Sequence, residues 1–454
     1  MMKKYRASFL RLLKILNVLA ITGTFANVWL NYYSSHTLIP FDYIGNIVVI
    51  LGFLILYYIF LRVYEGFFVE YHKVIHLIYS QVLSVLVTDA FLYAIICLFS
   101  YRLAYFIPGL IMFFWQAVII VVWSIFAKRF YFFVTDRRKA AVIWDMRTDI
   151  LNLVSEYYYN KNYEVVYGVN IRQVDYSLLD QVDAVFLMGV QSHDRNGIIK
   201  YCIDHRIVAY VIPRVGDVMM QAAERINILH LPVLKLARYA PSGEYLFIKR
   251  VCDIVISLIG IIIFSPIMVV VALLIRRDGG PAFYKQVRLT KDEKEFELLK
   301  FRSMRVDAEK DGVARLSTGV NDDRITKVGH VIRAIRFDEL PQLFNILKGD
   351  MSIVGPRPER PEIAEQYYEV LPEFRLRLQA KAGLTGYAQV FGKYNTSPYD
   401  KLLMDLMYIA RPSIWQDIAI CFGTVKILFM KESTEGIEEG AITSLAQLSD
   451  FDET

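Results

Sequence analysis

The sequence predicts three kinds of structure in one chain: a membrane α-helical bundle, an α/β doubly wound domain, and a mixed α/β domain with a re-entrant membrane helix hairpin. Hydrophobic residues make up 55% of the 454 residues, against about 45–50% in an average soluble protein. The excess is concentrated in residues 10–126 and again in 251–275, whereas short apolar runs alternate with longer stretches from residue 140 onward. A chain of this length is expected to form two or three units. The segments that we expect are residues 1–135, 136–236, 245–278, 279–431 and 432–454.

The first segment is predicted to cross a membrane four times. Its apolar stretches each reach the roughly 20 residues that a bilayer core requires, and they cover residues 10–30, 43–61, 77–99 and 103–126. On one side, residues 1–14, 62–73 and 128–139 carry twelve Lys or Arg residues, whereas the loops on the other side carry only Arg102. By the positive-inside rule, both ends of the bundle face the cytosol. Asp89 lies in the third stretch, either as a functional residue or with a buried partner, and we assign it no role.

The second segment, residues 136–236, is predicted to be a small Rossmann-like domain. Its apolar runs, AAVIW, YEVVYGV, DAVFLMG and IVAYVIP, are separated by helix-compatible segments in a βαβ rhythm. Such domains often bind a nucleotide at the first turn, but that turn, VIWDMRTD, contains no GxGxxG motif and no glycine. We therefore expect this domain to serve assembly or stability rather than to bind a dinucleotide.

The third segment, 245–278, is predicted to form a helix–break–helix hairpin that enters one leaflet and returns. Basic pairs flank its apolar part on both sides: Lys249 and Arg250, then Arg276 and Arg277. Both ends therefore favour the same membrane face. Near the middle, Pro266 removes a helix hydrogen bond and kinks the chain, and Ser265 can satisfy a freed backbone carbonyl. The alternative is a kinked fifth span, which would place all that follows on the other side.

Composition excludes several classes of function. The formal net charge is only +5, and no basic stripe with interleaved aromatic residues is present, so we expect no nucleic-acid partner. The four cysteines lie far apart without CxxC spacing, which argues against a disulfide framework or a zinc site. Residues 432–454 contain seven acids and no base, and are predicted to be a solvated tail.

An Asp-Glu pair, Asp338 and Glu339, stands directly before a predicted helix, LPQLFNILKG. Pro341 suits the first turn of that helix and Gly349 its C-terminal end. The helix dipole at this position favours negative charge and would keep an aspartate ionised. The apolar residues that we expect on the buried face, at helical spacing, are Leu340, Leu343, Phe344 and Leu347.

Cations surround this pair in the sequence. Prolines on both sides of Arg357 restrict its backbone, an arrangement suited to gripping phosphate in bidentate fashion. Lys381 belongs to a glycine-rich loop, KAGLTGYAQVFGK, whose backbone amides could approach a phosphate or a base. Further candidate cations are Lys300, Arg302, Arg333 and Arg336.

Paired carboxylates with several cations point to phosphoryl transfer at a membrane surface. An aspartate can act as a nucleophile and form an acyl-phosphate, while cations and a divalent ion offset the phosphate charges that would repel its attack. Mg²⁺ takes one or two carboxylates together with phosphate oxygens, and Glu339 fits that demand.

Four motifs in order, KFRSM, DELPQLFNILKGDMSIVGPRP, GLTGYAQV and DLMYI, resemble the bacterial sugar transferases, the polyprenyl-phosphate hexose-1-phosphate transferases. The resemblance covers about residues 245–429 and, with the four spans and the Rossmann-like domain, is to the large members, which often dimerise. It implies Asp338 as covalent nucleophile and Glu339 as ligand of Mg²⁺ (or Mn²⁺). It also implies Ser265 and Pro266 as the break in a re-entrant membrane helix. The substrate-binding residues expected on this basis are Lys300, Arg302, Arg333, Arg357, Lys381 and Gln389. One departure is Ala382, where many members have proline, which bears on loop rigidity and on the sugar accepted.

The function implied is that of a multi-pass inner-membrane enzyme with a cytoplasmic catalytic domain, acting as a homodimer. It would move a sugar-1-phosphate from a UDP-sugar to undecaprenyl phosphate and release UMP, in the first membrane step of exopolysaccharide, capsule or O-antigen synthesis. One alternative is a metal-dependent glycosyltransferase that releases UDP, although the sole DxD motif is Asp450-Phe451-Asp452 in the tail. A second is a non-catalytic membrane scaffold, which leaves the Asp-Glu and Pro-Arg-Pro clusters unexplained.

Overall fold

The computed structural model describes residues 6–38, 41–145, 162–238, 241–277, 279–306, 324–392 and 396–428. Contacts between residues divide the chain into two compact units, residues 1–211 and 212–454. The five segment bounds expected from the sequence stay predictions, and the acidic tail, 432–454, lies outside the described residues.

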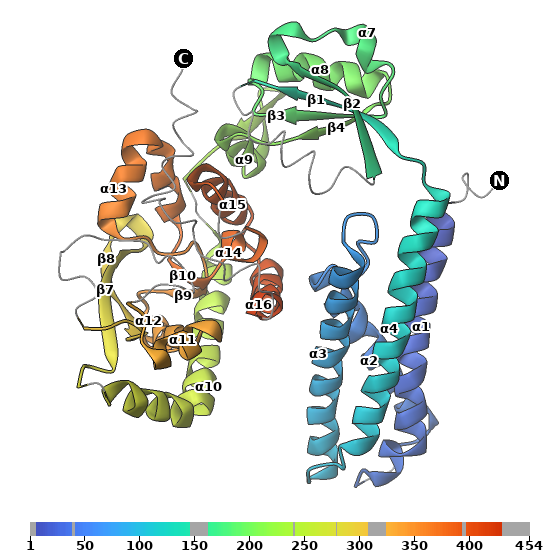
Figure 1. The fold of residues 1–454 in the computed structure, drawn as a ribbon, viewed down its shortest axis with the longest axis vertical. Helices are drawn as coiled ribbons and strands as arrows, with labels where there is room; N and C mark the ends of the chain where they lie inside the picture. Colours follow the sequence, from blue (N-terminus) through green and yellow to red (C-terminus); the bar gives the residue numbers. More distant parts are fainter. Residues whose placement is uncertain are drawn as a thin grey trace. The chain divides into compact units, whose positions relative to one another are not determined.

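The first unit begins with four long apolar helices (Figure 1). They are α1 (Arg6–Asn31), α2 (Tyr43–Val63), α3 (Val74–Ser100) and α4 (Ile107–Val134), with a short 3-10 turn, η2 (Tyr33–His36), after α1. With α10 (Gly243–Arg276) of the second unit, the described part of the chain holds five helices long and apolar enough to cross a membrane. The four stretches predicted to span are thus confirmed as helices, and their orientation stays a prediction.

The interior of this bundle combines an apolar core with several buried polar side chains, and further apolar side chains face outward. Asn17 donates from Nδ2 to Oε1 of Gln81 over 3.3 Å, and Gln81 donates to the Gly66 carbonyl over 2.9 Å. The Tyr57 hydroxyl lies 3.4 Å from Oδ1 of Asn17. Asp89 lies within α3 with both carboxylate oxygens shielded from solvent. Exposed apolar residues on α1 include Leu12, Ile15, Leu16 and Leu19. Such a distribution suits a helical bundle surrounded by lipid.

The four apolar runs predicted to be strands form a parallel sheet. Its strands are β1 (Arg138–Trp144), β2 (Tyr163–Asn170), β3 (Ala184–Met188) and β4 (Val208–Val211), in the order β2-β1-β3-β4. In the register, Ala140 of β1 pairs with Val165 of β2 and Ala184 of β3. All of β3 is buried, as in a sheet covered on both faces. Between β2 and β4 lie η4 (Ile171–Gln173), α7 (Tyr176–Leu179) and α8 (Ser192–Asp204).

Helix α8 packs on this sheet through Ile198 and Cys202, which share a core cluster with Val185 and Leu187 of β3. The connection from β1 to β2 includes residues 146–161, which lie outside the described residues together with part of the glycine-free first turn. The strand order agrees with an α/β domain, and the doubly wound arrangement stays a prediction.

The second unit is mixed α/β. It begins with α9 (Val215–Gln221) and an antiparallel hairpin, β5 (Glu224–Ile228) with β6 (Leu231–Lys235), before α10. Two further strand pairs follow: β7 (Phe283–Leu289) with β8 (Glu295–Phe301), antiparallel, and β9 (Ser352–Val354) with β10 (Gly383–Thr385), parallel. The helical elements after α10 are η5 (Lys291–Glu293), α11 (Lys327–Ala334), η6 (Phe337–Glu339), α12 (Gln342–Lys348), α13 (Pro361–Val370), η7 (Pro372–Gln379), α14 (Tyr387–Phe391), α15 (Pro398–Ala410) and α16 (Ile414–Leu428).

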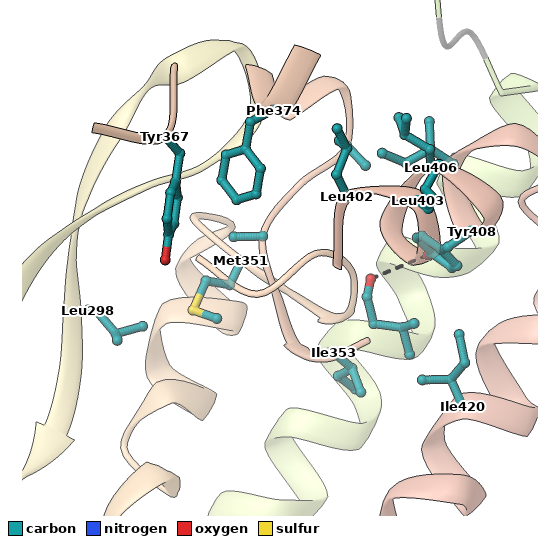
Figure 2. Packing of buried hydrophobic residues seen from close by; sticks show 14 of the residues in the cluster. Leu298, Met351, Ile353, Tyr367, Phe374, Leu402, Leu403, Leu406, Tyr408 and Ile420 are labelled. Carbon is teal, nitrogen blue, oxygen red and sulfur yellow. Dashed lines mark hydrogen bonds between the residues drawn. The ribbon is translucent and has the colours of Figure 1, made fainter. Parts of the chain in front are cut away.

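The core of the second unit gathers side chains from β8, β9, η7, α15 and α16. Figure 2 shows Leu298, Met351, Phe374, Leu402 and Ile420 converging there. The dashed line in Figure 2 joins the Tyr408 hydroxyl to the Val354 carbonyl of β9, 3.4 Å away. This packing holds β9 and, with it, the start of the loop that carries Arg357.

Helix α10 runs from Gly243 to Arg276 as one helix with Pro266 inside it, and Figure 1 shows it changing direction along its length. The Ser265 hydroxyl donates to the Ile262 carbonyl over 3.0 Å. That carbonyl is the one whose usual partner would be the missing N–H of residue 266. The serine therefore has the role expected for it, but the helix continues where the sequence suggested a break. Whether it re-enters the membrane stays a prediction.

Both ends of α10 contact the same folded unit. Near its start, Lys249 pairs with Asp417 at 2.8 Å, and Arg250 donates to the Ile346 and Leu347 carbonyls, each over 2.7 Å. At its end, the Ile275 carbonyl accepts from Arg302 over 3.2 Å. Lys249 and Arg250 were expected to act as membrane-flanking charges. The structure shows instead that both are committed to contacts within the domain.

Candidate active site

Asp338 and Glu339 lie on the 3-10 turn η6, one short turn before α12. The preceding residue, Arg336, has left-handed backbone angles, φ 57° and ψ 24°, an uncommon conformation for a residue with a side chain. Gly349 ends α12 with φ 100°, as expected, and its N–H bonds the Asn345 and Ile346 carbonyls. The two acids thus lie directly before the α-helix, as expected, on a separate 3-10 turn.

The face that α12 buries also differs from the expected stripe. Leu343 and Ile346 belong to the core, whereas Phe344 is 42% exposed. Asn345 is buried because its amide nitrogen donates to the Glu297 carbonyl over 2.7 Å and its oxygen accepts from the Leu299 N–H over 2.9 Å. These bonds tie α12 to β8 and turn the helix away from the face that apolar spacing alone predicted.

Glu339 is paired with two cations from distant parts of the sequence. Its Oε1 lies 3.2 Å from Lys300 Nζ and 3.0 Å from Arg357 Nη2, and its side chain is only 12% exposed. Burial by itself raises the pKa of Glu339, but Lys300 and Arg357 outweigh that effect and hold the pKa well below its usual range. Glu339 is therefore an anion that fixes two cations.

Asp338 differs from Glu339 both in its contacts and in the direction of its pKa shift. Within the described part of the chain, no hydrogen bond or ion pair to its carboxylate is found. Burial raises the pKa of Asp338, the charge of Glu339 raises it further, and Lys300, Arg333 and Arg336 oppose the rise. That a helix dipole keeps this aspartate ionised stays a prediction, and burial with the neighbouring charge of Glu339 acts against it. The 3-10 turn η6 therefore carries two different carboxylates. Glu339 forms ion pairs, whereas Asp338 has no partner among the described residues and has a raised pKa.

The turn also lies against the bend of α10. Phe337, directly before Asp338, meets Phe264 edge to face with ring centroids 6.1 Å apart. Phe264 immediately precedes Ser265 and Pro266. The unpaired carboxylate is thus next to the part of α10 where a proline interrupts the hydrogen-bond ladder.

Arg357 lies in the Arg357 loop, residues 355–360, which runs from β9 to α13. Two glycines let this loop pass close to the glycine-rich loop of residues 381–392. A Cβ on Gly386 would lie 2.2 Å from the Gly355 carbonyl oxygen, and one on Gly383 would lie 2.1 Å from the Gly355 nitrogen. These glycines permit a close backbone approach to the Arg357 loop, and an approach to a phosphate or a base stays a prediction.

The remaining predicted site residues separate into two groups. Arg333 is close enough to act on the charge of Asp338. Arg302 is buried, and its guanidinium donates to the Ile275, Pro281 and Met304 carbonyls over 2.8–3.3 Å. These bonds give Arg302 a structural task at the end of α10, and they argue against the expected phosphate contact.

The residues expected from the glycine-rich loop lie apart from the acids. The charges that act on Lys381 are Arg250, Asp253, Lys291 and Asp350, and neither Asp338 nor Glu339 is among them. Gln389 donates to the Leu384 carbonyl over 3.3 Å, and its buried Oε1 has no hydrogen-bond partner within the described residues. Substrate contacts by these two residues stay predictions.

Sequence reasoning missed several charged residues that the fold brings to Arg357: Arg288, Glu359, Arg377, Lys401 and Asp405. Asp405 begins the DLMYI motif, so a signal for it existed. The others lie outside any recognised motif, and only the fold assembles them. Lys401 is half-buried one helical turn before Asp405, and no hydrogen-bond acceptor for its ammonium is found among the described residues.

A known protein family matches residues of the second unit of this chain. The family model described as bacterial sugar transferase matches residues 244–431. An Aeromonas hydrophila UDP-N-acetylgalactosamine-undecaprenyl-phosphate N-acetylgalactosaminephosphotransferase is 38% identical over 50% of this chain and 53% of its own length. A Salmonella typhimurium undecaprenyl-phosphate galactose phosphotransferase is 40% identical over 41% of each chain. A Caulobacter vibrioides UDP-glucose:undecaprenyl-phosphate glucose-1-phosphate transferase is 38% identical over 41% of this chain and 71% of its own length.

The chain spans about half the length of the first two of these relatives and more than two thirds of the third. The family model covers α10, η6, the Arg357 loop and α15. The chain belongs to the bacterial sugar transferase family.

Proposed function

We propose that this protein transfers a sugar-1-phosphate from a UDP-sugar to undecaprenyl phosphate, giving undecaprenyl-diphosphate-sugar and UMP. The observation that carries the proposal is the pair of unlike carboxylates: Asp338 has no partner among the described residues, whereas Glu339 is held by Lys300 and Arg357. The names of the relatives, which pair undecaprenyl phosphate with a sugar phosphotransferase activity, support the same reaction.

The chemistry would run in two displacements. In the first, a carboxylate oxygen of Asp338 bonds to the sugar-bearing phosphorus, and the bond from that phosphorus to the oxygen bridging the two phosphates breaks. That oxygen and its electron pair leave with UMP. In the second, a phosphate oxygen of undecaprenyl phosphate attacks the same phosphorus, and Asp338 is released.

The neighbouring cations would make this attack possible. Two anions, a carboxylate and a phosphate, repel each other, and Lys300, Arg333 and Arg357 offset that repulsion at the point where charge gathers. Because Glu339 already binds Lys300 and Arg357 through Oε1, those cations are held in place before substrate arrives. Burial also raises the pKa of Asp338, so the carboxylate that attacks is more basic than an exposed aspartate.

The donor set fits a divalent cation. Both cations contact Oε1 of Glu339, and no contact to Oε2 is recorded in the described residues. Mg²⁺ binds one or two carboxylates and takes its other ligands from phosphate and water, so Glu339 Oε2 would hold Mg²⁺ (or Mn²⁺). Bound there, the ion would neutralise phosphate charge.

We further propose that α10 enters one leaflet and returns, so that the active site lies at headgroup depth on the cytoplasmic side of the inner membrane. Both ends of α10 contact one folded unit, and Phe264 at its bend touches the residue before Asp338. A straight helix of 34 residues would be about 50 Å long. A bent helix with both ends held by one domain fits a re-entrant segment better than a crossing. The homodimer, and an assembly role for residues 136–236, are proposals that rest on the resemblance to the large family members.

The test is UMP release from a UDP-sugar without any lipid acceptor. Purified full-length protein would be given UDP-glucose, UDP-galactose and UDP-N-acetylgalactosamine with Mg²⁺. We expect a burst of about one UMP per active site with one of them, and a sugar-phosphate mass adduct on Asp338. UMP release that needs undecaprenyl phosphate, with no adduct, would mean direct transfer. UDP release would replace the proposal with a glycosyltransferase.

A further inference from the structure

A buried ion pair lies beneath the Arg357 loop. Arg377 of η7 donates from Nε to Asp405 Oδ2 over 2.9 Å, and its Nη2 lies 2.7 Å from the same oxygen. The two side chains are only 4% and 1% exposed. Nη2 of Arg377 also donates to the Arg357 carbonyl over 2.9 Å. One guanidinium thus joins an aspartate of α15 to the backbone of the residue that clamps Glu339.

This bond belongs to a continuous set along the loop. The carbonyls of residues 356, 357, 358 and 359 accept, in turn, from the Gly383 N–H, Arg377, Arg288 and the Leu289 N–H, all over 2.9–3.0 Å. Prolines at 356 and 358 remove two N–H groups that could have bonded within the loop. The loop therefore depends on outside donors for its shape, and two of the four donors are arginine side chains.

A contribution to folding stability does not by itself explain why the Arg377–Asp405 pair is buried here. Taking two charges out of water costs several kcal/mol per ion, and apolar residues of similar size often serve a core as well or better. A planar guanidinium fork, however, holds a carboxylate and a carbonyl in fixed directions at the same time, which an apolar side chain cannot do and the compact ammonium of a lysine on its flexible stem does less rigidly. The geometry of Arg377 uses both of these directions.

We infer that Arg377, oriented by Asp405, is a positioning residue that fixes Arg357 for its contact with Glu339 and with the phosphates of the sugar nucleotide. This inference rests on the proposed function. Arg377 touches no reacting group itself and acts through the backbone of Arg357. A displacement of about 1 Å at a substrate-positioning group can cost about a hundredfold in rate, so loss of this bond should be visible in turnover.

The experiment is a cycle of four full-length proteins: wild type, Arg377→Lys, Arg357→Ala and the combination. Lysine can keep the ion pair with Asp405 but lacks the rigid fork that fixes the direction of the bond to the Arg357 carbonyl. The measurement is kcat/KM for UMP release, normalised to the burst amplitude so that only folded sites count. We expect Arg377→Lys to lower kcat/KM about tenfold to a hundredfold when Arg357 is present, and to change it less than twofold in the Arg357→Ala background. Equal losses in both backgrounds, or no loss in either, would overturn the inference.

A second variant tests whether the loss of activity reflects only a loss of folding stability. Arg377→Met with Asp405→Ala removes the whole pair, and such apolar replacements often retain stability. The same dependence on Arg357 is expected. The control is Lys285→Met, which breaks another ion pair of the domain, the 2.8 Å contact with Glu297 on the β7–β8 hairpin; its effect should be the same with and without Arg357. If wild type releases no UMP from any sugar nucleotide, the proposed function fails as well. If wild type is active and the cycle is additive, only the positioning role fails.

Discussion

Replacing Asp338 by asparagine should abolish activity and stabilise the fold at the same time. Asparagine keeps the shape of the side chain but cannot form the acyl-phosphate. Losing such a nucleophile costs on the order of 10⁴–10⁶ in kcat, which is about 5–8 kcal/mol of barrier. No other carboxylate can take its place, because Glu339 is committed to Lys300 and Arg357 through ion pairs of 3.2 and 3.0 Å.

The gain in stability follows from the sign of the pKa shift. Burial raises the pKa of Asp338 in the folded protein, so the folded state binds that proton more tightly than the unfolded state does. Above the raised pKa, the ionised carboxylate therefore costs stability. This cost begins to shrink as the pH falls through the raised pKa and is gone below the pKa of the unfolded state. A neutral asparagine avoids the cost at every pH. We expect a gain of about 0.5–2 kcal/mol at pH 8, or roughly 1–8 °C in melting temperature for a unit of this size, shrinking as the pH falls through the raised pKa.

The assay combines single-turnover UMP release with thermal melting of the detergent-solubilised full-length protein at pH 8 and pH 5. The control is Asp292→Asn, because Asp292 is 44% exposed and pairs only at the surface with Arg238; neither activity nor melting should change appreciably. A retained UMP burst in Asp338→Asn would refute the nucleophile. A variant that melts below wild type at pH 8 would refute the charge argument, even with activity lost.

Four other predictions use the same structure. Glu339→Gln should lower the free energy of unfolding by about 1–3 kcal/mol, because Lys300 loses its counter-charge. It should also move the acid limb of the pH profile of the single-turnover rate to lower pH, because the charge of Glu339 helps to raise the pKa of Asp338. An acid limb that stays in place or moves to higher pH would contradict this. Single cysteines at the exposed residues Glu244 and Pro281, in a cysteine-free protein, should both resist a membrane-impermeant thiol reagent in intact cells, and labelling at 281 alone would show that α10 crosses. Gly386→Ala should cost about 1–3 kcal/mol, because its Cβ would lie 2.2 Å from the Gly355 oxygen; Gly243→Ala, with nothing within 4 Å, is the control. NADH fluorescence should show no micromolar binding to the full-length protein, and a saturable signal would reassign residues 136–236.

Elements defined by local pattern were predictable from the sequence. The apolar stretches that became α1 to α4 and the runs that became β1 to β4 carry their signal in consecutive residues, because segment length and apolar content are local properties. The Asp338–Glu339 pair and the Pro-Arg-Pro segment were likewise visible as motifs. Ser265 was correctly expected to satisfy the carbonyl freed by Pro266, because the two residues are adjacent.

Only the tertiary structure decided which charges face each other. Glu339 lies 39 residues from Lys300 and 18 from Arg357, and no local pattern distinguishes its environment from that of Asp338 one residue earlier. Arg302 carries the same charge in sequence as Arg357, yet burial against three carbonyls gives it a structural task. The Arg377–Asp405 pair joins residues 28 apart on different elements. A charge acts according to its distance from partners and its removal from water, and both are properties of the folded chain.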